Sequence, residues 1–88
     1  MTSQMRRASV SVAANIAEGY GRQQTRSFIQ FLRISQGSLK EVETLVLLAG
    51  RVGLVGGEPV ERVMARCQRI GKMLVGLVRK LDLKEDRR

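Results

Sequence analysis

Apolar residues recur at alternating spacings of four and three along most of this chain, and that rhythm restricts the chain to packed α-helices. The longest such run lies in residues 26–52 and consists of Phe28, Leu32, Ser35, Leu39, Val42, Val46 and Ala49. It extends over about three heptads, which is typical of a helix that packs along its whole length. A second apolar row between Phe31 and Val52 widens the run, so this helix must contact more than one neighbour.

Two further helices are predicted on either side of the long run. Residues 3–18 carry an apolar stripe through Met5, Ala8, Val12 and Ile16. Residues 59–83 carry another core seam, which consists of Val63, Cys67, Ile70, Leu74, Leu77 and Leu81 and follows a break at Gly53, Gly56, Gly57 and Pro59. No sustained alternation of a β-strand competes with these patterns. We therefore predict one all-α domain over residues 1–88, folded as an up-down helical bundle.

The long central helix has one residue that weakens it. Gly37 lies inside the run, and glycine destabilises a helix interior by about 1 kcal/mol relative to alanine. We expect close packing at this position.

Seams this broad leave apolar surface uncovered in three helices alone. The chain has 88 residues, and a monomer of that size buries only roughly 60–65% of the surface that its unfolded chain exposes. We therefore predict a homo-oligomer, in which either a fourth helix from another copy or tight self-association completes the burial.

The composition excludes several classes of site. Histidine is absent and Cys67 is the lone cysteine, so no metal site and no nucleophile–base pair can be assembled. Glu41 and Glu43 are two residues apart and do not share a helix face. Apolar runs are shorter than the ~18 residues of a membrane span, and no signal-peptide core follows the first residues. We expect a non-enzymatic cytoplasmic protein with no cofactor and no membrane contact, in which Cys67 is a small core residue.

The net charge of +8 is unevenly placed. Residues 1–40 carry six basic side chains and one acidic one. Residues 41–61 carry one basic and four acidic side chains, and residues 62–88 carry nine basic and three acidic side chains. Basic zones that are separated from the acidic one favour a polyanion partner or an acidic protein surface.

The stronger basic zone forms a stripe on the third predicted helix. This basic stripe consists of Arg62, Arg66, Arg69, Lys72, Arg79 and Lys80. No acidic residue lies between Arg62 and Lys80, so ion pairs within the stripe cannot neutralise it, although pairing with Glu41, Glu43 or another subunit stays open. We favour a polyanion or acidic-partner surface over an ordinary solvated face. Aromatic residues are missing from the stripe, so contacts to nucleic acid should be to the backbone, with little sequence preference.

A second basic patch surrounds the first glycine turn and consists of Arg6, Arg7, Arg22 and Arg26. It is either a set of phosphate contacts or an ordinary solvated face, and the sequence favours neither. Tyr20 lies between Gly19 and Gly21 in this turn. It either anchors a partner from the surface or packs over the turn.

Asn15 and Glu18 lie one helical turn apart before that turn. They either share a recognition site with Arg7 and Arg22 or serve the fold, with Asn15 bonding across a helix interface and Glu18 pairing with Arg22. The structural interpretation is favoured, because one buried polar residue often sets the register of a bundle.

These residues belong to a block that carries a family resemblance. The block from Asn15 to Arg22 reads Asn-Ile-Ala-Glu-Gly-Tyr-Gly-Arg, and with residues 28–32, 37–44 and 70–77 it resembles the four-helix-bundle proteins encoded by intervening sequences in bacterial 23S ribosomal RNA genes. The resemblance runs from Ser3 to about Leu81. It implies an up-down four-helix bundle that assembles into a ring, commonly a pentamer.

The same resemblance extends to the accessory variability protein of diversity-generating retroelements, which implies binding to nucleic acid and to a reverse transcriptase. The family has a further helix before the segment that begins at Ser3. The helices predicted here therefore correspond to its second, third and fourth, and we expect either an upstream start or survival through association. Our leading hypothesis is an oligomer that binds RNA or RNA/DNA through its Arg and Lys stripes. The alternative is a scaffold that docks an acidic or nucleic-acid-bound partner such as a reverse transcriptase.

Overall fold

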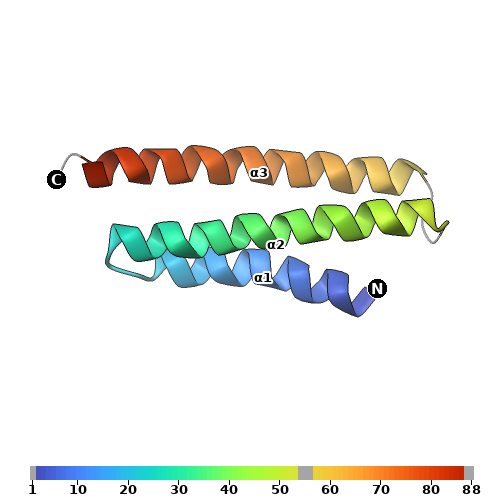
Figure 1. The fold of residues 1–88 in the computed structure, drawn as a ribbon, viewed down its shortest axis with the longest axis horizontal. Helices are drawn as coiled ribbons and strands as arrows, with labels where there is room; N and C mark the ends of the chain where they lie inside the picture. The colour runs from blue at the N-terminus through green and yellow to red at the C-terminus, as the bar shows by residue number, and fades with distance from the viewer. Residues whose placement is uncertain (1, 54–56, 87–88) are drawn as a thin grey trace.

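The computed structural model describes residues 2–53 and 57–86, and every regular element in them is a helix. Helix α1 is Thr2–Tyr20, α2 is Thr25–Arg51 and α3 is Gly57–Asp86. The chain runs along α1, back along α2 and forward again along α3, so α1 and α3 point the same way (Figure 1). The three predicted helices are confirmed, and their ends lie up to three residues from the predicted positions.

Glycines lie at the turns that follow α1 and α2. The amide of Gly21 donates to the carbonyl of Ala17 at 3.2 Å, and the amide of Arg22 donates to the carbonyl of Gly19 at 3.0 Å, so α1 continues two residues beyond its predicted end. After α2, Gly53 has a φ of +77°, a left-handed conformation that glycine adopts without steric cost. Gly56, predicted to be part of this second break, lies outside the described residues.

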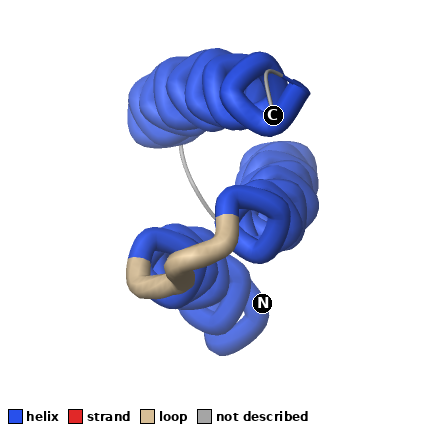
Figure 2. Tube along the Cα trace, turned by 90° about the vertical axis from the view of Figure 1, so that its left-hand side faces the viewer, coloured by secondary structure: helices blue, strands red, loops and turns tan. Residues whose placement is uncertain are grey.

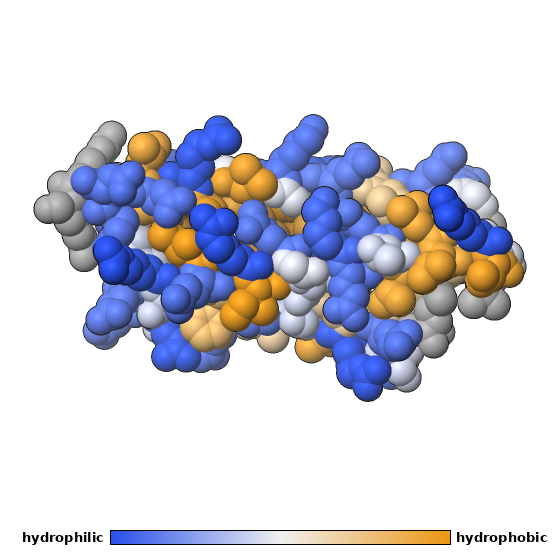
Figure 3. All heavy atoms as spheres, viewed as in Figure 1, coloured by the Kyte–Doolittle hydropathy of each residue, from blue (hydrophilic) through white to orange (hydrophobic). Residues whose placement is uncertain are grey.

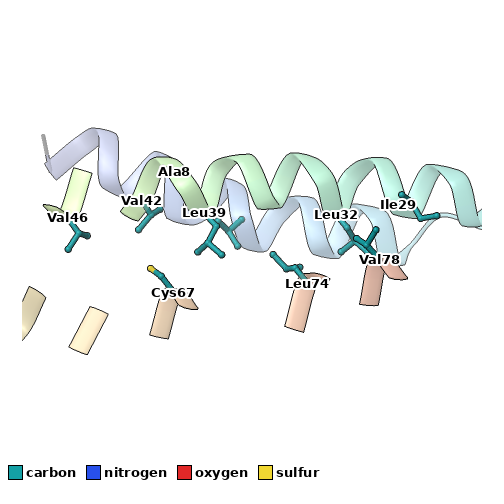
Figure 4. Close-up of a cluster of buried hydrophobic side chains, with 10 residues drawn as sticks. Ala8, Ile29, Leu32, Leu39, Val42, Val46, Cys67, Leu74 and Val78 are labelled. Carbon is teal, nitrogen blue, oxygen red and sulfur yellow. The ribbon is translucent and has the colours of Figure 1, made fainter. Parts of the chain in front are cut away.

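The core is a single row of side chains on α2, covered by α1 and by α3 (Figure 4). Helix α1 contributes Ala8 and Val12, and α3 contributes Cys67, Leu74 and Val78. The predicted seam of α2 is confirmed from Leu32 onward, because Leu32, Ser35, Leu39, Val42, Val46 and Ala49 are all buried. At its start the prediction is off by one residue: Phe28 is half-buried, and Ile29 is buried in its place.

Small residues bring α1 and α2 close together. Ser35 is fully buried, and its hydroxyl donates to the carbonyl of Val12 at 2.9 Å. A Cβ atom on Gly19 would lie 2.8 Å from the Cβ of Phe31, which is closer than packed carbon atoms allow. The prediction of close packing at Gly37 is wrong: that residue is exposed, and a Cβ atom added there would meet no neighbouring element within 4 Å, because Gly37 lies on the outer side of α2.

The molecule is open on one side. Helices α1 and α3 both pack against α2, but within the described residues no Cα atom of α1 lies within 8 Å of one in α3. Viewed end-on, the two helices flank α2 and leave the side opposite α2 uncovered (Figure 2). The Cα trace is accordingly long and thin, at 51 × 21 × 13 Å.

Candidate nucleic-acid interface and apolar groove

The predicted basic stripe of Arg62, Arg66, Arg69, Lys72, Arg79 and Lys80 lies on the surface of α3, and we call it the α3 stripe. The buried side of α3 carries Cys67, Leu74 and Val78, and this orientation leaves all six stripe residues exposed. From Arg62 to Lys80 the stripe extends about 27 Å along the helix. Within residues 2–53 and 57–86, none of the six cations lies within 4.0 Å of a carboxylate oxygen.

The nearby carboxylates pair with other cations. Glu43 lies 3.3 Å from the ammonium of Lys40 on its own helix. Two acidic residues of α3 pair with α2: Asp82 lies 3.7 Å from Arg33, and Glu85 lies 3.4 Å from Arg26. The question that the sequence left open is therefore answered for the described part of the chain: Glu41 and Glu43 do not neutralise the stripe.

The second basic patch is divided between paired and unpaired side chains. Arg22 lies 2.7 Å from Glu18, and its guanidinium carbon is 5.0 Å from the centre of the Phe31 ring. Arg26 lies 3.4 Å from Glu85 of α3. Arg6 and Arg7 are exposed, and neither has an ion pair among the described residues. The structure does not gather the four arginines into one unpaired cluster.

Asn15 and Glu18 both make contacts within the fold. Glu18 forms the predicted pair with Arg22. The Asn15 amide donates to the carbonyl and the hydroxyl of Ser11, at 2.8 Å and 3.0 Å. The expected bond across the helix interface is instead made by Ser11 itself, whose hydroxyl lies 2.7 Å from that of Ser38. Asn15 therefore positions the serine that joins α1 to α2.

Tyr20 combines features of both interpretations that the sequence allowed. Its ring packs edge-on against Phe28, with 6.2 Å between ring centres and 83° between planes. The residue is nevertheless 80% exposed, so most of its surface remains available to a partner.

An apolar groove runs between α1 and α3, with α2 as its floor. We call it the α1/α3 groove; it has a volume of about 1130 Å³. Val12, Ala13 and Ile16 line one wall, and Leu39 and Val42 lie in the floor. The α3 wall includes Val63, Ile70, Met73 and Leu77, and cations lie along it at Arg66, Arg79 and Lys80.

The sequence predicted that three helices leave apolar surface for a fourth helix to cover, but it located that surface on the long central helix rather than between α1 and α3. Val63 and Ile70 were assigned to the core seam of the third helix, yet they are 40% and 38% exposed. The apolar seam of α3 is wider than the face that α2 covers. The seam residues that α2 leaves exposed form the α3 wall of the groove.

A second apolar area lies on the outer side of α2. Leu47, Leu48 and Val52 are 50%, 43% and 62% exposed. Apolar side chains gather at the end of the molecule where α2 finishes, at the right of Figure 3.

Cys67 is the one thiol of the chain, and its environment makes it a poor nucleophile. It is 4% exposed. Burial, with a smaller contribution from the charge of Glu43, raises its pKa above the ordinary value of 9.0, which keeps the thiol protonated at neutral pH. Within the described ranges no three His, Cys, Asp or Glu side chains form a group suited to a metal ion. Of the three described helices, none combines the length and hydropathy that a membrane crossing requires.

Comparison with known proteins places this chain in a family. The model of the 23S rRNA-intervening sequence protein family matches residues 1–76. A protein of unknown function from the S23 ribosomal protein family of Bacteroides thetaiotaomicron has a similar crystal structure, with a TM-score of 0.86 and 28% identity over 89% of this chain and 72% of that one. No curated protein matches the chain. The resemblance found in the sequence is confirmed: this chain belongs to the 23S rRNA-intervening sequence protein family.

Proposed function

We propose that this chain is a non-enzymatic cytoplasmic protein that binds nucleic acid, RNA or RNA/DNA, through the α3 stripe. The observation that carries the proposal is the exposure of six cations along one helix with no carboxylate partner in the described part of the chain. Like charges in one row repel each other, and a polyanion relieves that repulsion while releasing its own counterions.

Contacts from such a stripe go to phosphates rather than to bases. Arginine makes forked contacts with phosphate oxygens, and four of the six stripe residues are arginine. The aromatic residue that is most exposed, Tyr20, lies on α1, outside the stripe. Binding should therefore depend on salt and show little sequence preference. The family name refers to an intervening sequence of 23S rRNA, which describes where the gene lies and names neither a ligand nor an activity.

The second part of the proposal is that the chain forms a homo-oligomer. The apolar area on the outer side of α2 includes Leu47, Leu48 and Val52, and exposed apolar area of this kind is typical of an interface. The family resemblance implies a four-helix bundle assembled as a pentamer. Light scattering of the purified protein tests this part, and a folded monomer at all concentrations would contradict it.

A salt titration with a fluorescent single-stranded RNA tests nucleic-acid binding. Log affinity falls as log salt rises, and each lost phosphate contact should reduce the magnitude of that slope by about 0.7. Arg62→Gln with Arg69→Gln should therefore reduce it by about 1.4. Arg33→Gln is the matched control, because Arg33 already lies beside Asp82. Absence of affinity at ~50 mM salt, or an affinity that does not change with salt, would refute the proposal.

The alternative function is docking of an acidic or nucleic-acid-bound protein, such as a reverse transcriptase. It is supported by the α1/α3 groove, which combines an apolar lining with Arg66, Arg79 and Lys80. Affinity purification with and without nuclease separates the two functions, since a partner that survives nuclease treatment is held by protein contacts.

A further inference from the structure

Tyr20 presents an open aromatic face at the end of α1. At 80% exposure, it is the most exposed large side chain with apolar character in the described part of the chain. Its ring centre lies 6.2 Å from that of Phe28, and the two ring planes meet at 83°. In an edge-to-face pair, one ring directs its edge at the face of the other, so Phe28 covers at most one face of the Tyr20 ring.

The turn that follows Tyr20 lies at the end of the molecule where the α3 stripe finishes. Arg26, at the start of α2, lies 3.4 Å from Glu85, near the end of α3. The turn between α1 and α2 and the C-terminal end of α3 lie at the same end of the fold (Figure 1). Lys80, the last residue of the stripe, precedes Glu85 by about 8 Å of helical rise. A strand that follows the stripe toward the C-terminus of α3 is therefore led to the end at which Tyr20 is exposed.

Cations follow Tyr20 in the same turn. The side chains of Arg22 and Arg26 are 48% and 82% exposed. Each has a carboxylate partner, Glu18 or Glu85, but ion pairs this exposed are weak, so either arginine can turn toward a phosphate. A nucleic acid at this end of the molecule thus meets positive charge beside an open aromatic face, which is the combination that binds single strands.

An open aromatic face favours single strands over duplexes. The bases of a duplex are paired and stacked on one another, whereas an unpaired base is free to stack on an aromatic side chain. Phosphates occur in both forms, so contacts from the α3 stripe alone discriminate between them only weakly. Every base has a flat face, so stacking adds little sequence preference.

We propose that the ring of Tyr20 stacks on an unpaired base and makes single-stranded RNA the preferred ligand, while the α3 stripe holds phosphates of the same strand. The proposal rests on nucleic-acid binding by the α3 stripe, and it names the form of nucleic acid that this binding favours.

Fluorescence anisotropy measures this preference with a labelled single-stranded RNA of about 12 nucleotides and with the same strand annealed to its complement. Tyr20→Ala should weaken binding of the single strand at least about fivefold and leave binding of the duplex unchanged. Tyr20→Phe keeps a stacking face and should bind as the natural chain does. Tyr20→Leu keeps an apolar contact with Phe28 but has no aromatic face, and should bind as Tyr20→Ala does. Val10→Ala is the matched control, because Val10 is another exposed side chain of α1.

Two further measurements separate stacking from a loss of charge. The slope of log affinity against log salt should be the same for Tyr20→Ala and the natural chain, because no phosphate contact is lost. Tyr20 is the one tyrosine of the chain, and tryptophan is absent, so tyrosine fluorescence reports on this ring alone. Single-stranded RNA should quench that fluorescence, and duplex RNA of equal absorbance should not.

Three results would contradict the proposal in different ways. Equal weakening of single-strand and duplex binding by Tyr20→Ala would show that the ring supports the fold. Unchanged single-strand binding, or fluorescence that saturating RNA does not quench, would leave the α3 stripe as the binding site and the ring for a protein partner. Absence of RNA binding by the natural chain would refute nucleic-acid binding itself, and the role of Tyr20 with it.

Discussion

The two helix–helix interfaces of this molecule are built from different kinds of residue. Between α1 and α2, contact is close: Gly19 lies against Phe31, and the buried Ser35 hydroxyl donates to the carbonyl of Val12. Between α2 and α3, larger side chains such as Leu74 fill the space, and the links at the surface are pairs of arginine with carboxylate.

This difference explains why the candidate functional surfaces lie on α3. An interface made by small residues lets α1 approach α2 closely. Helix α3 contacts α2 through a narrower face, Cys67, Leu74 and Val78, and its two flanks remain uncovered. One flank provides the wall of the α1/α3 groove and includes three residues of the basic stripe, Arg66, Arg79 and Lys80. The other three stripe residues lie outside the groove lining.

The largest expected effect comes from breaking the α2–α3 interface. Leu74 is 3% exposed, and Leu74→Ala should lower the free energy of unfolding by about 2–5 kcal/mol through lost burial and a residual cavity. Urea unfolding measures the loss, and hydrogen exchange should show that amides of α3 lose protection before those of α1 and α2. Met73→Ala is the matched control and should change stability by less than about 0.5 kcal/mol. Uniform loss of protection across the three helices would mean that the two interfaces unfold together, as one cooperative unit.

A smaller effect is expected at the close α1–α2 contact. In Gly19→Ala the new methyl group meets Phe28 and Phe31 at 2.8 Å, so overpacking should cost about 1–3 kcal/mol of unfolding free energy. Gly37→Ala is the control in open space and should raise stability by up to about 1 kcal/mol. Thermal unfolding measures both, and a neutral Gly19→Ala would show that the two helices can separate without loss.

The smallest effect concerns the titration of Cys67 at the α2–α3 interface. Its pKa is raised by burial and by the charge of Glu43, so the folded chain holds the thiol proton more tightly than the unfolded chain does. The resulting stability is present below the ordinary pKa of 9.0 and is lost as the pH rises through the folded-state value. Between about pH 8 and about pH 10, unfolding free energy should therefore fall more steeply in the natural chain than in Cys67→Ala.

Glu43→Gln sharpens this last test. Removal of the carboxylate leaves burial as the main cause of the raised Cys67 pKa. The difference between Glu43→Gln and Cys67→Ala in the slope of unfolding free energy against pH should therefore be smaller than for the natural chain, but not zero. Denaturant unfolding over the same pH series measures it, and identical slopes in the natural chain and Cys67→Ala would contradict the assignment.

Periodicity predicted the parts of the fold that depend on local geometry. The α2 seam from Leu32 to Ala49 is buried as the spacing indicated, because apolar residues at spacings of three and four must share a helix face. The composition of the α3 stripe was also evident from the sequence, since no acidic residue lies between Arg62 and Lys80.

Features that depend on a partner helix were not predictable in the same way. The close glycine was expected at Gly37 and is found at Gly19, because contact depends on which face of α2 meets α1. The interhelical bond was expected from Asn15 and is made by Ser11 with Ser38. In both cases, the register between two helices selects the residue.

Local spacing and charge order thus specified three helices, their apolar seams, the basic stripe and the family. The arrangement of those helices specified what remains exposed. Val63, Ile70 and Cys67 belong to one seam in the sequence, yet Cys67 is buried while Val63 and Ile70 line an open groove. Periodicity reports which residues share a helix face, whereas burial depends on how far a neighbouring helix extends over that face.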